Sequence, residues 1–398
     1  MKLTLSSGAA SEVFYNGKFY PTGKEIDMPL SEALRFNKTF RQQIREKTVP
    51  YDPFLFGEQK EIAMMADIDT QSGWGNVGLN LIKYSVDDVK TAQFGQLVGV
   101  VDKEVLEASR RGIEASMGLV IHEQPKEEWL TLPFERKIAI VPFETTRIPQ
   151  SWVPRINSCK ALIVPCKQNV EMMRDSGITI PIEIVHWGID PEKFYEIERP
   201  RRDTFTFGTM GSLSLRKGTD ILVKAFFEEF KYEKDVRLLC KTSSNNFLWA
   251  VRDPRMQVDM TPVSHEELMN LFFKQIDCFV FPTRGEGFGL TPLEAAATGV
   301  PIIATGWSGI KEYMTPEIGW EIDHTMEPAT SFSEKVYKEP CGFWALPDKE
   351  NLKKLMRYAY EHKNETKEKG KKAAEYVRRE WTWKKKIPMY IDALKKHL

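Results

Sequence analysis

Short runs of consecutive apolar residues recur along the chain, each bounded by polar or glycine-containing stretches. Residues 278–281 and 301–304 are two such runs, and a continuous apolar run of this length predicts a strand buried in a parallel sheet. Further runs of this kind lie at residues 61–66, 137–143, 161–164, 205–208 and 236–240. Between the runs, apolar residues recur at helical spacing, for example at Leu222, Phe226 and Phe230. The alternation of strands with helices predicts an α/β fold with parallel sheets.

The chain of 398 residues is longer than a single hydrophobic core usually supports, so we expect two domains. We place the first at residues 59–195 and the second at residues 203–375. The charged stretch between them has the composition of an interdomain linker.

Residues 1–58 precede both domains and are expected to form a small N-terminal appendage. A turn at Asn16 and Gly17 predicts two short paired strands in this region. A helix is expected from about Leu30, with Ser31 as its cap. Whether the appendage packs on the two domains or recruits a partner is open.

Charge and composition argue against several classes of protein. Lysine plus arginine and aspartate plus glutamate number 56 each, and zero formal net charge argues against broad binding to nucleic acid. No stretch approaches the ~20 apolar residues that span a bilayer, and the first residues lack the apolar core of a signal peptide. The five cysteines have no C-x-x-C spacing and the six histidines no H-x-x-x-H arrangement, so we expect a cytoplasmic protein without a metal site.

A glycine-rich segment follows the predicted strand at residues 278–281 and carries the main chemical signal. Three glycines lie between residues 285 and 289, directly before a short predicted helix. Ligands of open α/β sheets bind at the carboxyl ends of strands, where the N–H groups of a helix N-terminus favour an anion. Glu286 and Glu294 flank this place, so a ligand with both phosphate and hydroxyl groups would suit it.

These two glutamates reproduce the E-x7-E signature of retaining glycosyltransferases, and the run E-G-F-G-L-x-x-L-E-A-x-x-x-G resembles that of their large family 4. The resemblance implies the GT-B fold, in which two Rossmann-like domains face a central cleft and residues 376–398 cross back to the first domain. It implies further that Glu294 holds the ribose of a nucleotide diphosphate sugar and that Glu286 contacts the donor sugar. The backbone along the sugar and diphosphate would be that of Gly287, Phe288, Gly289, Leu290 and Thr291.

Residues 211–218 resemble the family pattern G-R-L-x-x-x-K-G, whose arginine and lysine neutralise the diphosphate. Lys217 matches the lysine, and the resemblance makes it a catalytic residue together with Glu286. Ser212 stands at the position of the arginine, and a hydroxyl does not reproduce a bidentate arginine–phosphate contact. Arg216, four residues on, is the candidate replacement, although its place at a helix start leaves this open.

Two segments of the first domain are candidates for the acceptor side of the cleft. Residues 69–78 include Gly73 and Gly75, and family members have a glycine-rich loop at this point. These glycines also match the dinucleotide fingerprint G-x-G-x-x-G, but a polar stretch separates them from the preceding strand, so the match is weak. Glu144 and Arg147 follow another predicted strand, in a stretch similar to E-x-x-x-x-P-x-x-W of one branch of the family. An ordinary surface loop is an equal alternative there.

The function implied by the resemblance is transfer of a hexosyl unit from a UDP- or GDP-sugar to an acceptor hydroxyl, with retention at the anomeric carbon. No cofactor beyond this donor and no metal ion is expected. The acceptor would be a glycan or a lipid-linked sugar, and a protein side chain or a modified nucleobase stays open. Neither the donor base nor its sugar follows from the sequence.

Four alternatives compete with this prediction. Asp67 and Asp69 match the D-x-D of metal-dependent, single-domain glycosyltransferases. An epimerase or a phosphorylase is compatible with the same architecture. A non-catalytic nucleotide-sugar-binding or scaffold protein would account for Ser212 and for the N-terminal appendage. Finally, Thr291 and Glu294 have the spacing of a helix-capping box, which would give Glu294 a purely structural role.

Overall fold

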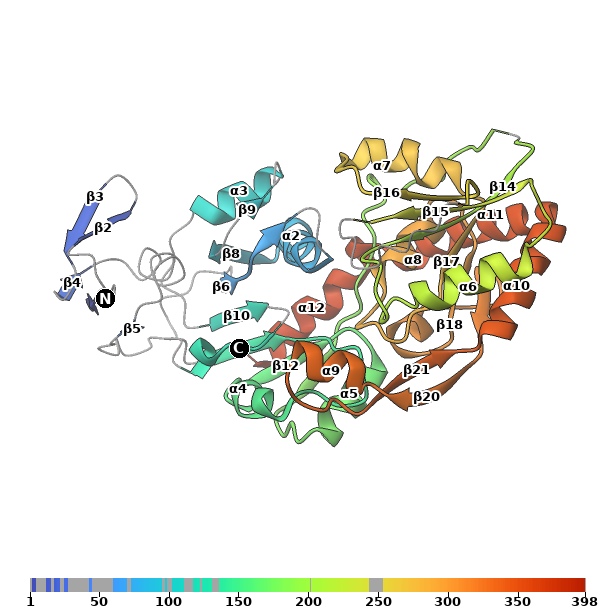
Figure 1. The fold of residues 1–398 in the computed structure, drawn as a ribbon. Coiled ribbons are helices and arrows are strands. Elements are labelled where there is room, and N and C mark those ends of the chain that lie inside the picture. The colour runs from blue at the N-terminus through green and yellow to red at the C-terminus, as the bar shows by residue number, and fades with distance from the viewer. Residues whose placement is uncertain are drawn as a thin grey trace.

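The computed structural model describes residues 2–4, 12–15, 18–21, 25–27, 43–44, 60–69, 73–94, 97–98, 102–110, 117–121, 124–130, 136–200, 202–242 and 253–397 (Figure 1). In these ranges the chain forms two six-stranded sheets, one in each half of the molecule.

The first domain is built on a wholly parallel sheet with the strand order β13-β12-β11-β10-β6-β8. Its strands are β6 (Lys60–Met65), β8 (Val89–Phe94), β10 (Met117–Ile121), β11 (Arg136–Ile140), β12 (Ala161–Val164) and β13 (Ile182–Ile184). The central strands are apolar and fully buried because both faces of the sheet are covered. The helices of this domain are α2 (Gly73–Ser85), α3 (Lys103–Arg110), α4 (Val153–Asn157) and α5 (Lys167–Asp175).

The second domain repeats this plan with the strand order β16-β15-β14-β17-β18-β19, again wholly parallel. Its strands are β14 (Phe205–Met210), β15 (Val236–Lys241), β16 (Met256–Asp259), β17 (Cys278–Phe281), β18 (Ile302–Thr305) and β19 (Gly319–Ile322). Its helices include α6 (Thr219–Glu229), α7 (His265–Leu271), α8 (Leu290–Ala297) and α10 (Lys349–Glu361). The two sheets confirm the predicted α/β architecture with two Rossmann-like halves.

Five short strands are described in the appendage at residues 1–58. They are β1 (Lys2–Thr4), β2 (Glu12–Tyr15), β3 (Lys18–Pro21), β4 (Glu25–Asp27) and β5 (Gln43–Ile44). Strands β2 and β3 pair antiparallel, which confirms the strand pair predicted around the Asn-Gly turn. The helix predicted from Leu30 lies outside the described residues.

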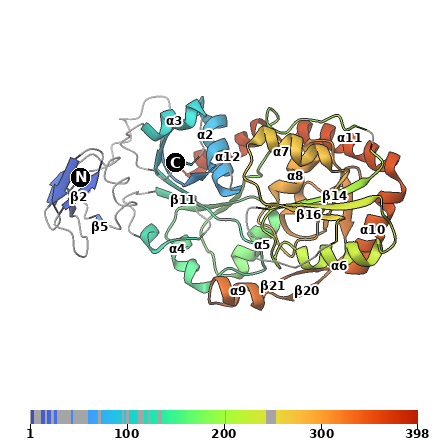
Figure 2. The same cartoon turned by 45° about the horizontal axis from the view of Figure 1, so that its top comes forward.

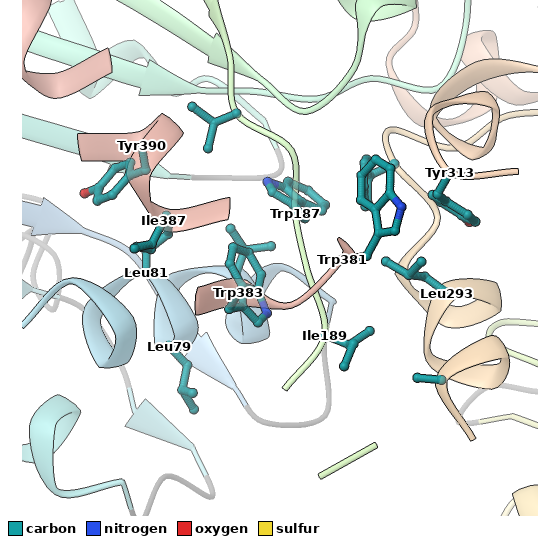
Figure 3. Packing of buried hydrophobic residues seen from close by; sticks show 14 of the residues in the cluster. Leu79, Leu81, Trp187, Ile189, Leu293, Tyr313, Trp381, Trp383, Ile387 and Tyr390 are labelled. Atoms are coloured by element: carbon teal, nitrogen blue, oxygen red, sulfur yellow. The ribbon is translucent and has the colours of Figure 1, made fainter. Parts of the chain in front are cut away.

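The two chain segments that connect the domains are bonded to each other. The first follows β13, and the second joins α11 (Lys363–Glu380) to α12 (Trp383–His397), which packs on α2 and β13. The Ile189 amide donates to the Trp381 carbonyl at 2.8 Å, and the Trp383 amide donates back to the Ile189 carbonyl at 3.0 Å. Around this junction, Trp187 and Trp381 lie in one buried cluster with residues of both domains (Figure 3).

A second connection is made by residues 324–347, which we call the bridging segment. It consists of β20 (His324–Pro328), α9 (Thr330–Val336) and β21 (Phe343–Pro347), and it leaves the second sheet after β19. The Tyr337 ring lies 5.3 Å from both Phe143 and Trp152 of the first domain. At the same place, the Thr146 amide donates to the Phe343 carbonyl, and the Phe343 amide donates to Thr146 Oγ1, each at 2.8 Å. Helix α9 consequently lies beside the first domain although it belongs to the second (Figures 1 and 2).

Gly188 is expected to be required for the junction between the connecting segments. A Cβ at this position would lie 2.5 Å from the backbone carbon of Thr382, so Gly188→Ala forces the two segments apart. Overpacking of this kind costs about 1–3 kcal/mol, which thermal unfolding followed by circular dichroism should detect as a lower melting temperature. Gly73→Ala is the matched control, because a Cβ there meets nothing within 4 Å. Equal melting temperatures for Gly188→Ala and the wild type would contradict the tight junction.

Candidate functional site

The glycine-rich loop runs from the end of β17 to the start of α8. Gly289 is the N-cap of α8 and has a φ of 87°, a conformation that glycine adopts without strain. Among the described residues no side chain caps this helix, so its first N–H groups are available to a ligand. Thr291 lies inside the helix and is not its cap. The capping box proposed for Thr291 and Glu294 is therefore wrong, and the structural role it gave Glu294 disappears.

The loop is pressed against the first domain at two glycines. A Cβ on Gly285 would lie 1.9 Å from the carbonyl oxygen of Glu144, and one on Gly287 would lie 2.6 Å from Cβ of Pro142. Any side chain at either position would push the two domains apart. The loop therefore lies at the boundary between the domains, as a ligand site in an interdomain cleft requires.

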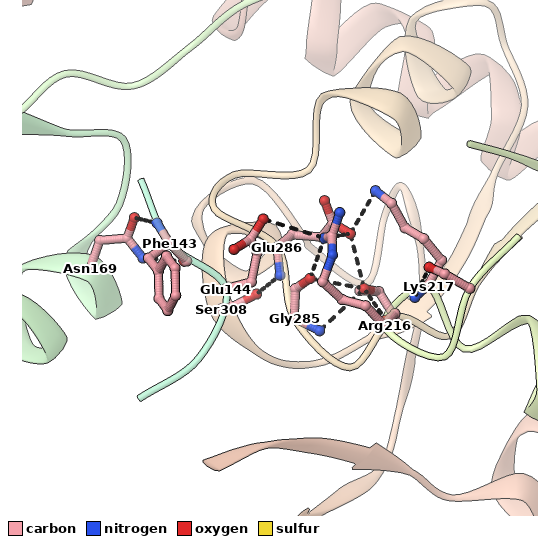
Figure 4. Close-up of polar contacts among 10 residues, drawn as sticks. Phe143, Glu144, Asn169, Arg216, Lys217, Gly285, Glu286 and Ser308 are labelled. Carbon is pink, nitrogen blue, oxygen red and sulfur yellow. Dashed lines mark hydrogen bonds and ion pairs between the residues drawn. The ribbon is translucent and has the colours of Figure 1, made fainter. Parts of the chain in front are cut away.

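Glu286 sits in this loop as the centre of an ion cluster (Figure 4). Its Oε1 accepts hydrogen bonds from Lys217 Nζ at 2.8 Å, from Arg216 at 3.0 Å and from Thr283 Oγ1 at 3.0 Å. Burial would raise the pKa of Glu286, but attraction to Lys217 and Arg216 outweighs it and holds the pKa below its usual value. Burial lowers the pKa of Lys217, and the attraction of Glu286 offsets this only in part.

Arg216 is the guanidinium of this cluster. It also donates to the carbonyl of Gly285 at 2.9 Å and lies 3.8 Å from the Glu144 carboxylate of the first domain. Two cations are thus balanced by two carboxylates. An anionic ligand that enters the site would compete with these carboxylates for Arg216 and Lys217.

Glu294 differs from Glu286 in that its pKa is raised and not lowered. It is partly buried on α8, and burial raises its pKa to about 7. Within the part of the chain that the structure describes, no hydrogen bond or ion pair holds its carboxyl group. Burial raises the pKa of the nearby Tyr313 hydroxyl, and the charges of Glu286 and Glu294 raise it further. This hydroxyl donates a hydrogen bond to the Gly289 carbonyl at 2.6 Å. A carboxyl that is costly to ionise and has no partner is suited to bind hydroxyl groups.

The remaining predicted site residues lie in different surroundings. Ser212 is in the loop after β14, where no partner is recorded for it in the described ranges, so Arg216 is the guanidinium that the structure brings to the cluster. Phe288 is buried between the domains, with its ring 5.7 Å from Trp187 and 6.0 Å from Trp381, which leaves only its backbone for a ligand. Leu290 packs against the core. Arg147 is exposed, and its Cγ would lie 3.4 Å from a Cβ on Gly342 of the bridging segment.

Gly73 and Gly75 do not form a loop. Helix α2 begins at Gly73, so residues 73–78 of the segment predicted as a glycine-rich loop are helical, and both glycines lie in the first turn of the helix. Trp74 between them has its ring 6.1 Å from that of Trp187. The start of α2 therefore reaches the boundary between the domains.

Thr283 and Ser308 also contact Glu286, but neither was predicted from the sequence as a site residue. The Glu286 amide donates to Ser308 Oγ at 3.2 Å, and Ser308 has a φ of 60°, which is uncommon for a residue other than glycine. Ser308 follows β18, the neighbour of β17, so parallel strands bring it to the same edge of the sheet. The position of Ser308 shortly after a predicted strand was the feature of the sequence that could have identified it.

No helix among the described residues is long and apolar enough to cross a membrane. No group of three or more histidine, cysteine, aspartate or glutamate side chains among them is arranged to hold a metal ion.

The two glutamates are expected to affect stability in opposite directions in the ligand-free protein. Because the pKa of Glu294 rises from 4.5 in its ordinary state to about 7, its carboxyl destabilises the fold progressively as the pH rises through this interval. Glu294→Gln should therefore melt above the wild type at pH 8, and the difference should shrink towards pH 5. Glu286→Gln should melt below the wild type at pH 8, because Lys217 and Arg216 lose their partner. A Glu294→Gln variant that melts below the wild type at pH 8 would show that this carboxylate has a stabilising partner.

Part of the chain is similar in sequence to known proteins. Residues 204–336 match the family model described as glycosyl transferases group 1. A segment of 44 residues, 11% of the chain, is 54% identical to the lipopolysaccharide core biosynthesis mannosyltransferase LpsB of Rhizobium meliloti. Over 181 residues, 40% of the chain, it is 32% identical to a D-inositol 3-phosphate glycosyltransferase of Pseudarthrobacter chlorophenolicus. These matches span only 12% and 43% of the respective relatives.

Solved structures share the fold over most of the chain. Sucrose-phosphate synthase from Thermosynechococcus elongatus superposes with a TM-score of 0.64 at 14% identity, covering 85% of this chain and 99% of that one. HepE of Anabaena, solved in complex with UDP and glucose, gives a TM-score of 0.63 at 11% identity, covering 85% and 100%. At this identity the likeness establishes the fold, which is GT-B. Residues 204–336 are therefore similar to glycosyl transferases group 1, and the chain has a GT-B fold over most of its length.

Proposed function

We propose that the protein is a retaining glycosyltransferase that transfers a sugar from a UDP- or GDP-sugar to an acceptor hydroxyl. The observation that carries this proposal is the contrast between the two signature glutamates. Glu286 is paired with two partly buried cations at the domain boundary, whereas Glu294 has no partner among the described residues and burial raises its pKa to about 7. One place thus offers positive charge for a diphosphate and a carboxyl for hydroxyls.

In this proposal the donor exchanges partners with the ion cluster. The diphosphate lies between Arg216, Lys217 and the N-terminus of α8, where charge-assisted hydrogen bonds and the helix dipole stabilise it. Glu286 is released towards the hydroxyls of the donor sugar, and Glu294 binds the ribose. Arg216 does the work of the arginine that Ser212 replaces, because its guanidinium already lies 3.0 Å from Oε1 of Glu286.

The chemical step follows from what these groups can do. Both glutamates hold the donor, so neither serves as the nucleophile that a double displacement requires. The acceptor hydroxyl attacks the anomeric carbon from the face that the diphosphate leaves, and a departing phosphate oxygen takes its proton. Arg216 and Lys217 stabilise the charge that develops on the diphosphate, and closure of the domains holds donor and acceptor together. These cations give the reaction its electrophilic assistance without a metal ion.

A glycan or lipid-linked sugar is the acceptor class we propose. The similar LpsB and a similar CapM of Staphylococcus aureus are named for lipopolysaccharide core and capsular polysaccharide biosynthesis, which supports this choice. Glu144 of the first domain faces Arg216 at 3.8 Å and is the residue best placed to contact an acceptor hydroxyl. Assays of glycosyl transfer with a protein or a nucleobase as the acceptor test the two alternative acceptor classes.

Nucleotide binding tests the donor site. In a panel of UDP, GDP, ADP and their sugars, the nucleotide that binds should, at a hundred times its dissociation constant, stabilise the wild type by about 2.7 kcal/mol, measured as a thermal shift. Glu294→Ala should lose the shift for the one nucleotide that binds, whereas Glu350→Ala, a surface carboxylate paired with Lys353, should keep it. If no nucleotide stabilises the wild type, the donor site is wrong. If a nucleotide sugar binds but no glycosyl transfer or donor hydrolysis occurs, the non-catalytic alternative is right.

Glu286→Gln is expected to separate binding from catalysis. Removing the carboxylate that competes for Arg216 and Lys217 should tighten the binding of free UDP or GDP, while turnover of the sugar donor falls by about 10²–10³-fold. Lys217→Ala should weaken nucleotide binding and turnover together. Isothermal titration calorimetry and donor hydrolysis measure the two effects. Weaker nucleotide binding by Glu286→Gln would contradict the exchange of partners.

A further inference from the structure

Arg284 lies two residues before Glu286 and is 6% exposed. Its guanidinium donates to both carboxylate oxygens of Asp220, at 2.8 and 3.0 Å, and to Glu327 Oε1 at 3.1 Å. A further N–H group donates to the carbonyl of Leu215. Two carboxylates therefore neutralise this cation and its donors are occupied within the protein. Arg284 is not in a state to bind an anionic ligand, although it adjoins the site.

These partners join the loop of Glu286 to the loop of the two cations. Leu215 directly precedes Arg216, and Asp220 lies in the first turn of α6, just after Lys217. The backbone of Arg284 adds a bond, because its amide donates to the Arg216 carbonyl at 2.7 Å. Both sides of the Glu286 ion cluster are thus fixed to the side chain or backbone of one residue.

The same guanidinium also touches the bridging segment. Glu327 lies on β20, and it accepts a second hydrogen bond from Trp344 Nε1 on β21 at 3.0 Å. The Arg284 guanidinium lies over the Trp344 ring at 5.7 Å, and the Arg284 carbonyl accepts from the Ala345 amide at 2.9 Å. The Trp344 ring in turn stacks on Phe332 of α9, with the ring centroids 5.5 Å apart. Arg284 is consequently in contact with the segment that docks on the first domain.

We propose that Arg284 is a positioning residue of the donor site, which holds Arg216 and Lys217 opposite Glu286 and couples this arrangement to docking of the bridging segment on the first domain. The inference rests on the proposed function, since the donor site is what Arg284 positions. The physical reason lies in the planar fork of arginine, whose donors reach Asp220, Glu327 and the Leu215 carbonyl at once. A lysine keeps the charge but cannot make all of these bonds.

Arg284→Lys tests the proposal against the matched control Arg255→Lys. Arg255 also pairs bidentately with a carboxylate, that of Asp253, and donates to backbone carbonyls of the same domain, but it contacts neither loop of the site. In the full chain, Arg284→Lys should weaken binding of UDP or GDP, measured by calorimetry, between about tenfold and a hundredfold, because small misplacements of positioned groups are costly. Arg255→Lys should lower the melting temperature but change binding by less than about twofold.

Hydrogen exchange of the ligand-free protein gives a readout that does not depend on the donor. Arg284→Lys should speed exchange in peptides covering residues 211–222 and in peptides covering the bridging segment, and Arg255→Lys should speed it in neither. Tyr337→Ala, which loosens the bridging segment from Phe143 and Trp152, should also weaken nucleotide binding. Normal nucleotide binding by Arg284→Lys, or unchanged exchange in either region, would overturn the positioning role. If the wild type binds no nucleotide, the proposed function fails, and the exchange experiment still decides whether Arg284 holds the segments together.

Discussion

The ion cluster of Glu286, Arg216 and Lys217 is the interaction on which the rest of the site depends. Burying charge is costly unless each charge is paired and hydrogen-bonded, and here one carboxylate oxygen receives three hydrogen bonds. The cluster forms only because two loops from different parts of the second domain meet at the ends of their strands. A ligand that replaces Glu286 as the partner of the cations must bring negative charge of its own, which selects for an anion.

The cluster lies where the two domains touch, so its geometry depends on how the domains are held. The glycine-rich loop has no room for side chains at Gly285 and Gly287 because the first domain lies directly against it. The paired connecting segments near Gly188 and the bridging segment hold the domains together at two separate places. A GT-B enzyme that closes on its substrates would have to move about these connections, and residues that join them to the site can transmit such movement.

Much of the fold could be predicted from the sequence, because continuous apolar runs determine buried parallel strands and glycines mark the loops between strand and helix. Lys217 and the two glutamates could be found because local patterns identify them. The place of Arg216 could not, since only the folded loop shows that its guanidinium reaches Glu286. The first turn of α2 was taken for a loop because glycines are poor helix formers, and packing against the interdomain cluster overrides that preference.

The bridging segment and Arg284 escaped prediction for a related reason. The residues of the bridging segment do not reveal its partner, because the rings of Phe143 and Trp152 that contact Tyr337 lie almost two hundred positions away in the sequence. Likewise, the spacing of Thr291 and Glu294 left a capping box open as an alternative, whereas in the structure the N-cap is Gly289, two residues before Thr291. Tertiary contacts decided both cases.

A crystal structure of the protein with UDP or GDP bound tests the central claim most directly. The account predicts the diphosphate between Arg216, Lys217 and the first turn of α8, the ribose hydroxyls on Glu294, and a separation of Lys217 Nζ from Glu286 longer than the present 2.8 Å. A nucleotide bound elsewhere, or bound while the Glu286 cluster stays intact, would contradict it.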